Sequence, residues 1–154
     1  MAAYIDCQNA WVSILRGLTS QFSTTAQVAV NDYTVLDAGV LTAAVFTPGT
    51  VGRVPQKANY VRSWGGILDL FYAWRGDLPS SLTPFETLRA AVILAIDNNP
   101  NLVIPPATSG VAGVYDTTIE SDGDPQPYPV TPGSATRFVA QRFRIISYQF
   151  LRAQ

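Results

Sequence analysis

The sequence has 154 residues, of which 47% are hydrophobic and 14% are charged, and its formal net charge is −1. This length predicts one domain with a single core, and a charged fraction well below the roughly 25% of ordinary globular domains indicates that part of the surface contacts other protein. The scattered basic residues argue against a dedicated nucleic-acid binder, and the chain shows neither a stretch typical of a membrane span nor a signal-peptide pattern.

The first predicted element is an amphipathic helix over residues 4–21 that needs a sheet to cover its apolar stripe. The residues of this stripe recur at spacings of three and four: Ile5, Trp11, Ile14, Leu15, Leu18 and Phe22. Cys7 is the only cysteine, so it cannot form an internal disulfide. Because it lies among apolar residues of the helix, we interpret it as a packing residue rather than a nucleophile.

Two strands are predicted next. Residues 26–36 begin with strand-like alternation and carry an Asn-Asp turn signal in their middle. Residues 40–46 form the second strand. We expect Thr47-Pro48-Gly49 to end it, because proline and glycine interrupt both helices and sheets.

A loop is predicted over residues 50–59, where we find no hydrophobic period. It contains Arg53 and Lys57. The run Gly49-Thr50-Val51-Gly52-Arg53 superficially resembles a phosphate-binding loop. It lacks the Gly-Lys-Ser/Thr ending that contacts phosphate and Mg²⁺, so we expect no nucleotide site here.

Residues 60–74 predict a long strand in the centre of the sheet or at an interface. Its two faces are both largely apolar toward its end: Trp64, Leu68, Leu70, Tyr72 and Trp74 alternate with Ile67, Asp69, Phe71 and Ala73. The strand ends at Arg75-Gly76-Asp77, which is ordinary turn chemistry. No pocket is indicated around Asp69 and Asp77, so we favour a sheet-edge or intersubunit pairing role for them over an acid/base pair.

The run Thr83-Pro84-Phe85-Glu86 predicts the start of a helix over residues 84–97. Thr83 would cap it, proline would occupy the first helical position, and Glu86 would reach back to the cap. Asn98-Asn99-Pro100 ends the helix, because proline disfavours a helical residue before it. The helix is apolar around most of its circumference, so we expect it to be covered on more than one side.

Residues 103–135 are predicted to form a long loop, within which residues 113–119 can form a short strand. Loops beyond about 12–15 residues are usually functional or disordered, and we expect this one to become ordered on assembly. Its acidic residues 120–124 could supply oxygen ligands to Ca²⁺. The spacing of an EF-hand is missing, however, and we favour a solvated turn.

The chain ends with a long predicted strand over residues 136–151. It far exceeds the usual length of about five or six residues, so we expect part of it to project beyond the sheet or to bend at a bulge. Arg142 and Arg144 lie on one face of this strand, together with Tyr148 and Phe150. On that face the two arginines can meet water, carboxylates or another subunit.

The sequence contains no histidine, which removes the commonest general base, the Ser-His triad and most zinc sites. It also has no Gly-x-Ser-x-Gly elbow of the kind that carries a nucleophilic serine. We therefore expect a protein without catalytic residues, metal or cofactor.

The predicted order is helix, early strands, aromatic strand, capped helix, long loop and terminal strand. The early strands end in Ala43-Ala44-Val45-Phe46-Thr47-Pro48-Gly49, and the aromatic strand ends in Leu70-Phe71-Tyr72-Ala73-Trp74-Arg75-Gly76-Asp77. In the order of its elements, its length and the general pattern of its sequence, the chain resembles the tail terminator (tail completion) proteins of long-tailed bacteriophages, which belong to the head–tail connector group. The likeness covers nearly the whole chain.

The resemblance implies a single α+β domain over residues 1–154, with a mixed or antiparallel sheet flanked by two main helices. It also implies a structural virion protein of the tail and neck, assembled in the host cytoplasm. Such a protein forms a hexameric ring that caps the tube made by the tail tube protein and joins the head–tail connector. DNA then passes through the lumen of the ring without specific binding.

Low charge and elements that are apolar on both faces favour contacts between subunits, and loops and long strands can supply them. The candidate contact residues are Arg53, Lys57, Arg75, Asp77, Arg142, Arg144, Tyr148 and Phe150. Two alternatives remain open. One is a head–tail stopper or adaptor protein of the neck, and the other is a small ligand-binding or enzymatic α+β domain that uses the Trp/Tyr-rich strand as a pocket wall.

Overall fold

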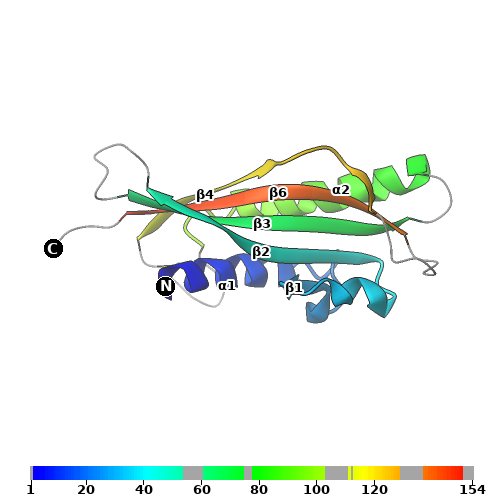
Figure 1. Cartoon of the computed structure of the whole chain (residues 1–154), viewed down its shortest axis with the longest axis horizontal. Coiled ribbons are helices and arrows are strands. Elements are labelled where there is room, and N and C mark those ends of the chain that lie inside the picture. The colour runs from blue at the N-terminus through cyan, green and yellow to red at the C-terminus, as the bar shows by residue number, and fades with distance from the viewer. Residues whose placement is uncertain are drawn as a thin grey trace.

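A mixed sheet of six strands forms the centre of the molecule, and two helices pack against one of its faces (Figure 1). The computed structural model describes residues 2–53, 61–74, 78–102, 111, 113–128 and 137–150. The elements in chain order are α1 (Ala2–Arg16), the 3₁₀ helix η1 (Thr25–Gln27), β1 (Val28–Val30), the 3₁₀ helix η2 (Tyr33–Ala38), β2 (Thr42–Arg53), β3 (Val61–Trp74), α2 (Leu78–Asp97), β4 (Val114–Ser121), β5 (Gln126–Tyr128) and β6 (Arg137–Phe150). The predicted α+β class is confirmed.

The strands follow the order β1-β2-β3-β6-β4, and β5 also pairs with β6. Among the described strands, only β1 and β2 are parallel to each other. β3 and β6 have 14 residues each and pair along their whole length, from Val61 opposite Phe150 to Trp74 opposite Arg137. The central position predicted for β3 is confirmed. The projection or bend expected of the last strand is wrong, because β3 is long enough to pair with every residue of β6.

β2 does not end at Thr47-Pro48-Gly49 but continues to Arg53, with a bulge between Pro48 and Val51. The last pair between β1 and β2 joins Val30 and Phe46. Beyond Phe46, no described strand lies on the outer side of β2, so Pro48 removes no ladder hydrogen bond there. Residues 50–53 of the predicted loop therefore belong to β2. Residues 54–60 lie outside the described part.

α1 ends at Arg16, five residues before the predicted end, because the backbone tightens into short turns at Gly17 and Leu18. Trp11 and Leu15 of its apolar stripe are fully buried, whereas Ile5 is 54% exposed. Cys7 is also fully buried, and burial followed by the charge of Asp6 raises its pKa to about 11. A thiol that keeps its proton at neutral pH agrees with a packing role.

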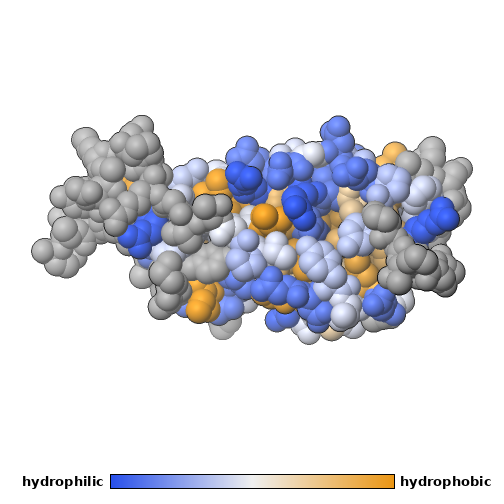
Figure 2. Space-filling model, in the orientation of Figure 1, coloured by the Kyte–Doolittle hydropathy of each residue, from blue (hydrophilic) through white to orange (hydrophobic). Residues whose placement is uncertain are grey.

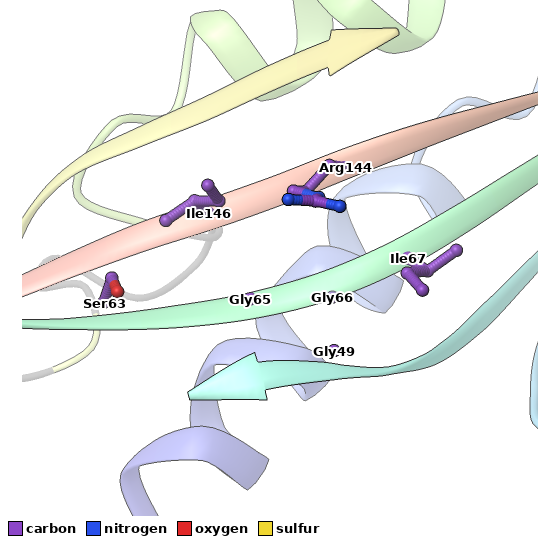
Figure 3. A pocket seen from close by; sticks show the side chains of 7 residues that line it. All are labelled: Gly49, Ser63, Gly65, Gly66, Ile67, Arg144 and Ile146. Carbon is purple, nitrogen blue, oxygen red and sulfur yellow. The ribbon is translucent and has the colours of Figure 1, made fainter. Parts of the chain in front are cut away.

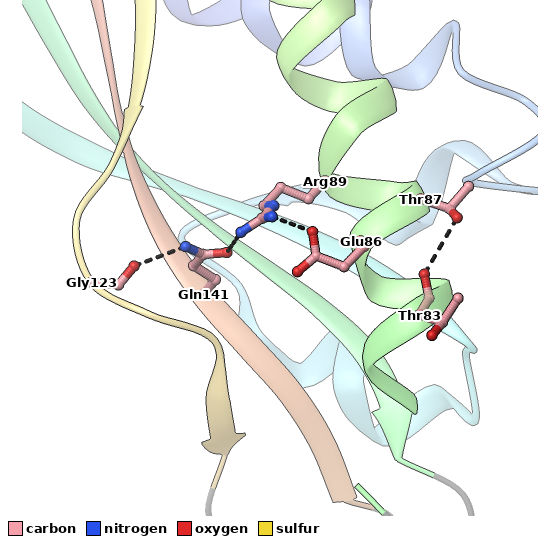
Figure 4. Close-up of polar contacts among 6 residues, drawn as sticks. All are labelled: Thr83, Glu86, Thr87, Arg89, Gly123 and Gln141. Atoms are coloured by element: carbon pink, nitrogen blue, oxygen red, sulfur yellow. Dashed lines mark hydrogen bonds and ion pairs between the residues drawn. The ribbon is translucent and has the colours of Figure 1, made fainter. Parts of the chain in front are cut away.

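α2 begins at Leu78, so the predicted start at Thr83-Pro84 is wrong. Pro79, not Pro84, occupies the first turn, where a missing N–H is tolerated. Thr83 lies inside the helix, where its carbonyl accepts a hydrogen bond from Thr87, and Glu86 forms an ion pair with Arg89 instead of a capping box (Figure 4). The helix buries one stripe completely, formed by Phe85, Leu88, Val92 and Ile96, while Leu94 is 60% exposed. We expected this helix to be covered on more than one side, but the side that carries Leu94 is open to solvent.

This start of α2 changes the expected effect of replacing Thr83. Thr83 is exposed and caps nothing, so Thr83→Ala should alter the free energy of unfolding by less than about 0.5 kcal/mol. Urea denaturation measures this change. A loss of about 1 kcal/mol, the usual cost of removing a cap, would show that the helix begins at Thr83 after all.

Two segments of the predicted loop over residues 103–135 are strands. β4 pairs with β6 along its length, with a bulge between Val114 and Asp116, and β5 pairs with β6 further along. The short strand expected at residues 113–119 is thus confirmed and extends to Ser121. Residues 103–110, 112 and 129–136 lie outside the described part, and the expected ordering on assembly stays a prediction for them.

Candidate assembly surface on the sheet

The face of the sheet opposite α1 and α2 is covered over only half of its length. We call it the open face. On the covered half, residues of η2 pack onto an apolar cluster of the strands; the cluster contains Val35, Leu36, Ala43, Val45, Phe71, Ala73 and Phe138. On the other half, no element of the described chain lies over the strands. Seen from the side opposite α2, hydrophobic and hydrophilic residues lie intermixed along the middle of the molecule (Figure 2).

The uncovered half contains a shallow trough of about 220 Å³, lined by Gly49, Ser63, Gly65, Gly66, Ile67, Arg144 and Ile146. Figure 3 shows side chains from β3 and β6 around the three glycines, with α1 on the other side of the sheet. A Cβ atom at Gly49 would lie 2.7 Å from the carbonyl group of Gly65, so only glycine lets β2 approach β3 here. The trough therefore has a floor of backbone and a rim of isoleucine and arginine side chains.

Arg142 and Arg144 share the open face, but their surroundings differ. Arg142 donates two hydrogen bonds to Asp69, from Nε to Oδ1 at 2.9 Å and from Nη2 to Oδ2 at 3.1 Å. The hydroxyl of Tyr33 donates to the same Oδ2 at 2.7 Å, so the carboxylate ties η2 to the sheet. Arg144 is exposed, and no ion pair or hydrogen bond joins its side chain to the described residues.

The Asp69 carboxylate shifts the pKa of both partners. It raises the pKa of Arg142 further above its usual value, mainly through the hydrogen bond. Burial and then the hydrogen bond to Asp69 raise the pKa of Tyr33 from 10.0 to about 12. Because folding raises this pKa, the native state holds the phenol proton more tightly than the unfolded chain does.

The contribution of Tyr33 to stability is thus fully present below pH 10 and should be lost as the pH rises toward about 12. Urea denaturation over this range measures the loss. Tyr33→Phe is the matched variant, because it keeps the ring and removes the titrating group, and its stability should fall less over the same range. An equal fall in both proteins would show that Tyr33 does not carry the effect.

An aromatic group lies at the far end of the uncovered half. The rings of Tyr115 and Tyr148 are 6.4 Å apart, and Phe150 ends β6. Tyr115 is 49% exposed and Phe150 is 50% exposed. Two large aromatic side chains half open to solvent are typical of a contact surface.

The acidic residues 120–124 form the end of β4 and the turn before β5. Gln141 holds this turn by donating to the carbonyl of Gly123 at 2.8 Å, and it accepts a hydrogen bond from Arg89 of α2 (Figure 4). Glu120, Asp122 and Asp124 are exposed. Among the described residues, no three His, Cys, Asp or Glu side chains come together as a metal site requires, and the exposed carboxylates agree with a solvated turn.

The structure places the residues predicted to contact other subunits in different surroundings. Arg144, Tyr148 and Phe150 share the uncovered half of the open face, as the alternation of β6 predicts. Arg142 shares the face but is bound to Asp69 within its own chain. Arg53 is the last residue of β2, and its side chain lies outside the described part of the structure. Lys57, Arg75 and Asp77 lie outside it entirely.

Two of the less specific interpretations are corrected as well. Asp69 does not lie at a sheet edge, because β3 is flanked by β2 and β6, and its carboxylate pairs with Arg142 of the same chain. The glycine-containing run at residues 49–53 belongs to β2 and forms no loop.

Sequence reasoning missed the partners of Asp69 and a buried chain of hydrogen bonds. In that chain, Trp11 Nε1 donates to the Ser147 hydroxyl at 2.9 Å, which lies 2.9 Å from the Thr117 hydroxyl. Thr117 in turn donates to the carbonyl of Pro100 at 3.0 Å. No local pattern predicts such pairs, because they depend on strand register.

A scan against models of known protein families finds no match, and a search among curated proteins finds no relative of significant similarity. Neither helix of the described chain combines the length and apolar character that crossing a membrane requires.

Proposed function

We propose that this protein is a structural virion protein that forms a ring, caps the tail tube of a long-tailed bacteriophage and joins the tail to the head connector. The proposal combines the resemblance seen in the sequence with the α+β fold. The observation that carries it is the uncovered half of the open face, where Ile67, Arg144 and Ile146 surround a backbone floor and lead to Tyr148 and Phe150.

A surface of this composition suits contact with protein. Its centre is apolar and glycine-lined, its rim carries a guanidinium, and its end is aromatic, and aromatic residues and arginine are the residue types enriched at interfaces. Other apolar side chains stay exposed on the helix side, at Ile5 and Leu94. A protein that joins a tail tube to a head connector needs two contact surfaces besides those that form the ring, and the molecule offers apolar surface on both sides of the sheet.

The trough is less suited to a small ligand. At about 220 Å³ it is smaller than the typical ligand pocket of roughly 300–1,000 Å³. It is also open along the sheet, so it could bury little of a small molecule. A second open hollow of about 470 Å³ lies beside Asp69, Phe71 and Tyr128, and its volume falls within the range of ligand pockets. The volumes therefore do not separate the two roles, and the assembly test below does.

The test is to mix the purified protein with tubes assembled from tail tube protein and to examine them by electron microscopy and native mass spectrometry. We expect a ring, of six copies according to the resemblance, at one end of each tube. Arg144→Glu should weaken the binding of the ring to the tube, because it reverses the charge at the rim of the trough. Asp37→Lys is the matched control, because Asp37 is exposed on η2, over the covered half of the same face.

Other outcomes separate the alternatives. Binding to head connector rings but not to tail tubes would identify a stopper or adaptor of the neck. A protein that stays monomeric with both partners would contradict an assembly role and favour the ligand-binding domain.

A further inference from the structure

We infer that copies of this protein associate head to tail through their sheet edges, with β4 of one copy adding to residues 47–53 of β2 in the next. The occupant of each edge is thus a second copy of the chain. The inference rests on the proposed ring and specifies the surface that builds it.

The two edges lie at the same level of the sheet, on opposite sides. The register connects Thr47 to Ile67, then Arg144, then Glu120 across the four strands β2, β3, β6 and β4. At the other end it connects Arg53 to Arg62, then Gln149, then Val114. A second copy placed alongside therefore meets β2 with β4 without sliding along the strands.

Both edges have free backbone groups within the described chain. β1 stops opposite Phe46, and no backbone hydrogen bond joins residues 47–53 to a described residue outside β3. On β6, Arg142 accepts from Asp122, and Phe150 donates to Gly113, so the even-numbered residues of β6 face β4. Their partners in β4 include Thr118 and Glu120, which leaves the backbone groups of Thr117 and Ile119 directed outward.

The two edges carry opposite charge. Residues 47–53 of β2 contain one basic residue, Arg53, and no acidic one, and Arg53 pairs with Arg62 of the neighbouring strand β3. From residue 90 to residue 136 the sequence contains no basic residue, and the acidic ones include Asp116 and Glu120 of β4. The β4 edge is therefore acidic, and the β2 edge is basic.

This charge pattern favours contact between the β4 edge of one copy and the β2 edge of another. Two β4 edges would repel each other, as would two β2 edges, whereas β4 and β2 attract. Pro48 offers the added strand a carbonyl but no N–H, and the bulges make both edges irregular, which disfavours pairing with unrelated chains. Because the sheet continues from one copy to the next, β4 and β2 meet antiparallel, and a contact between two unlike patches generates a closed ring when its rotation closes.

The test uses two charge-reversed variants of the full chain, one with Asp116→Lys and Glu120→Lys and one with Arg53→Glu and Arg62→Glu. Each alone should associate roughly tenfold or more weakly than the natural protein, because both of its edges then carry the same sign. An equimolar mixture should assemble again, with the two variants alternating and the rings holding even numbers of copies. Asp37→Lys is the control, native mass spectrometry gives the composition, and melting curves show that each variant is folded.

Variants that assemble as the natural protein does, or a mixture that does not recover, would overturn the edge contact while leaving the ring in place. Rings built through these edges that ignore tail tubes would support the contact and overturn the terminator role instead. A natural protein that stays monomeric even on tail tubes would overturn both.

Discussion

Arg142→Ala is expected to lower the free energy of unfolding by about 2–4 kcal/mol, whereas Arg144→Ala should change it by less than about 0.5 kcal/mol. The two arginines lie two residues apart on the same face of β6, and both are exposed. They differ in their partners. Arg142 binds Asp69 through two hydrogen bonds, and Arg144 has no such partner among the described residues.

The loss arises at the carboxylate rather than at the arginine. The side chain of Asp69 is only 10% exposed and lies on a central strand. Without Arg142, Tyr33 is the one among the described side chains that still donates a hydrogen bond to it, and a buried charge left without its counter-ion is strongly destabilising. Because Arg142 itself is half exposed, water screens part of the interaction, and the expected value lies toward the lower end of the range for buried pairs.

Urea denaturation of the two single variants and of Asp69→Ala/Arg142→Ala measures the effect. The double variant removes the carboxylate as well, so it should be more stable than Arg142→Ala alone. If the double variant were the least stable of the three, the arginine would act mainly through packing of its aliphatic stem. If Arg144→Ala were as destabilising as Arg142→Ala, the difference in partners would not explain the result.

The sequence predicted those parts of the fold that local periodicity determines. The alternation of β3 and β6 and the helical stripe of α2 follow from side chains near one another in the chain. The strand predicted over residues 26–36 is wrong beyond Val30, because residues 33–38 form the 3₁₀ helix η2. Several boundaries differ from the prediction. β2 crosses Pro48 because β1 ends opposite Phe46, and α2 begins at Leu78 although Thr83 and Pro84 carry a complete start signal.

The candidate surface was predictable to a similar degree. Alternation places Arg144, Tyr148 and Phe150 on one face, but it cannot show that Asp69 lies opposite Arg142 or that η2 covers only half of that face. The same limit applies to the opposite charges of the two sheet edges. These charges are visible in the sequence, but only the strand order places them on opposite sides.

Ser147→Ala should lower the free energy of unfolding by about 1–3 kcal/mol, because it interrupts the buried hydrogen-bond chain from α1 to the turn after α2. The carbonyl of Pro100 can only accept, so Thr117 must donate to it. The Thr117 oxygen then accepts from Ser147, whose oxygen accepts from the indole N–H of Trp11. Each hydroxyl thus donates once and accepts once, and Ser147 is fully buried between the two neighbours.

A double-mutant cycle with Trp11→Phe separates the hydrogen bond from packing. Trp11→Phe removes the indole donor and also leaves space in the core, where Trp11 is fully buried. If the hydrogen bond carries the effect, the double variant should be less destabilised than the sum of the single variants by about 1 kcal/mol. Ser13→Ala on the exposed side of α1 is the control and should be near neutral. Full additivity would mean that the hydroxyl and the indole stabilise the protein independently, and that α1 is held to the sheet by packing alone.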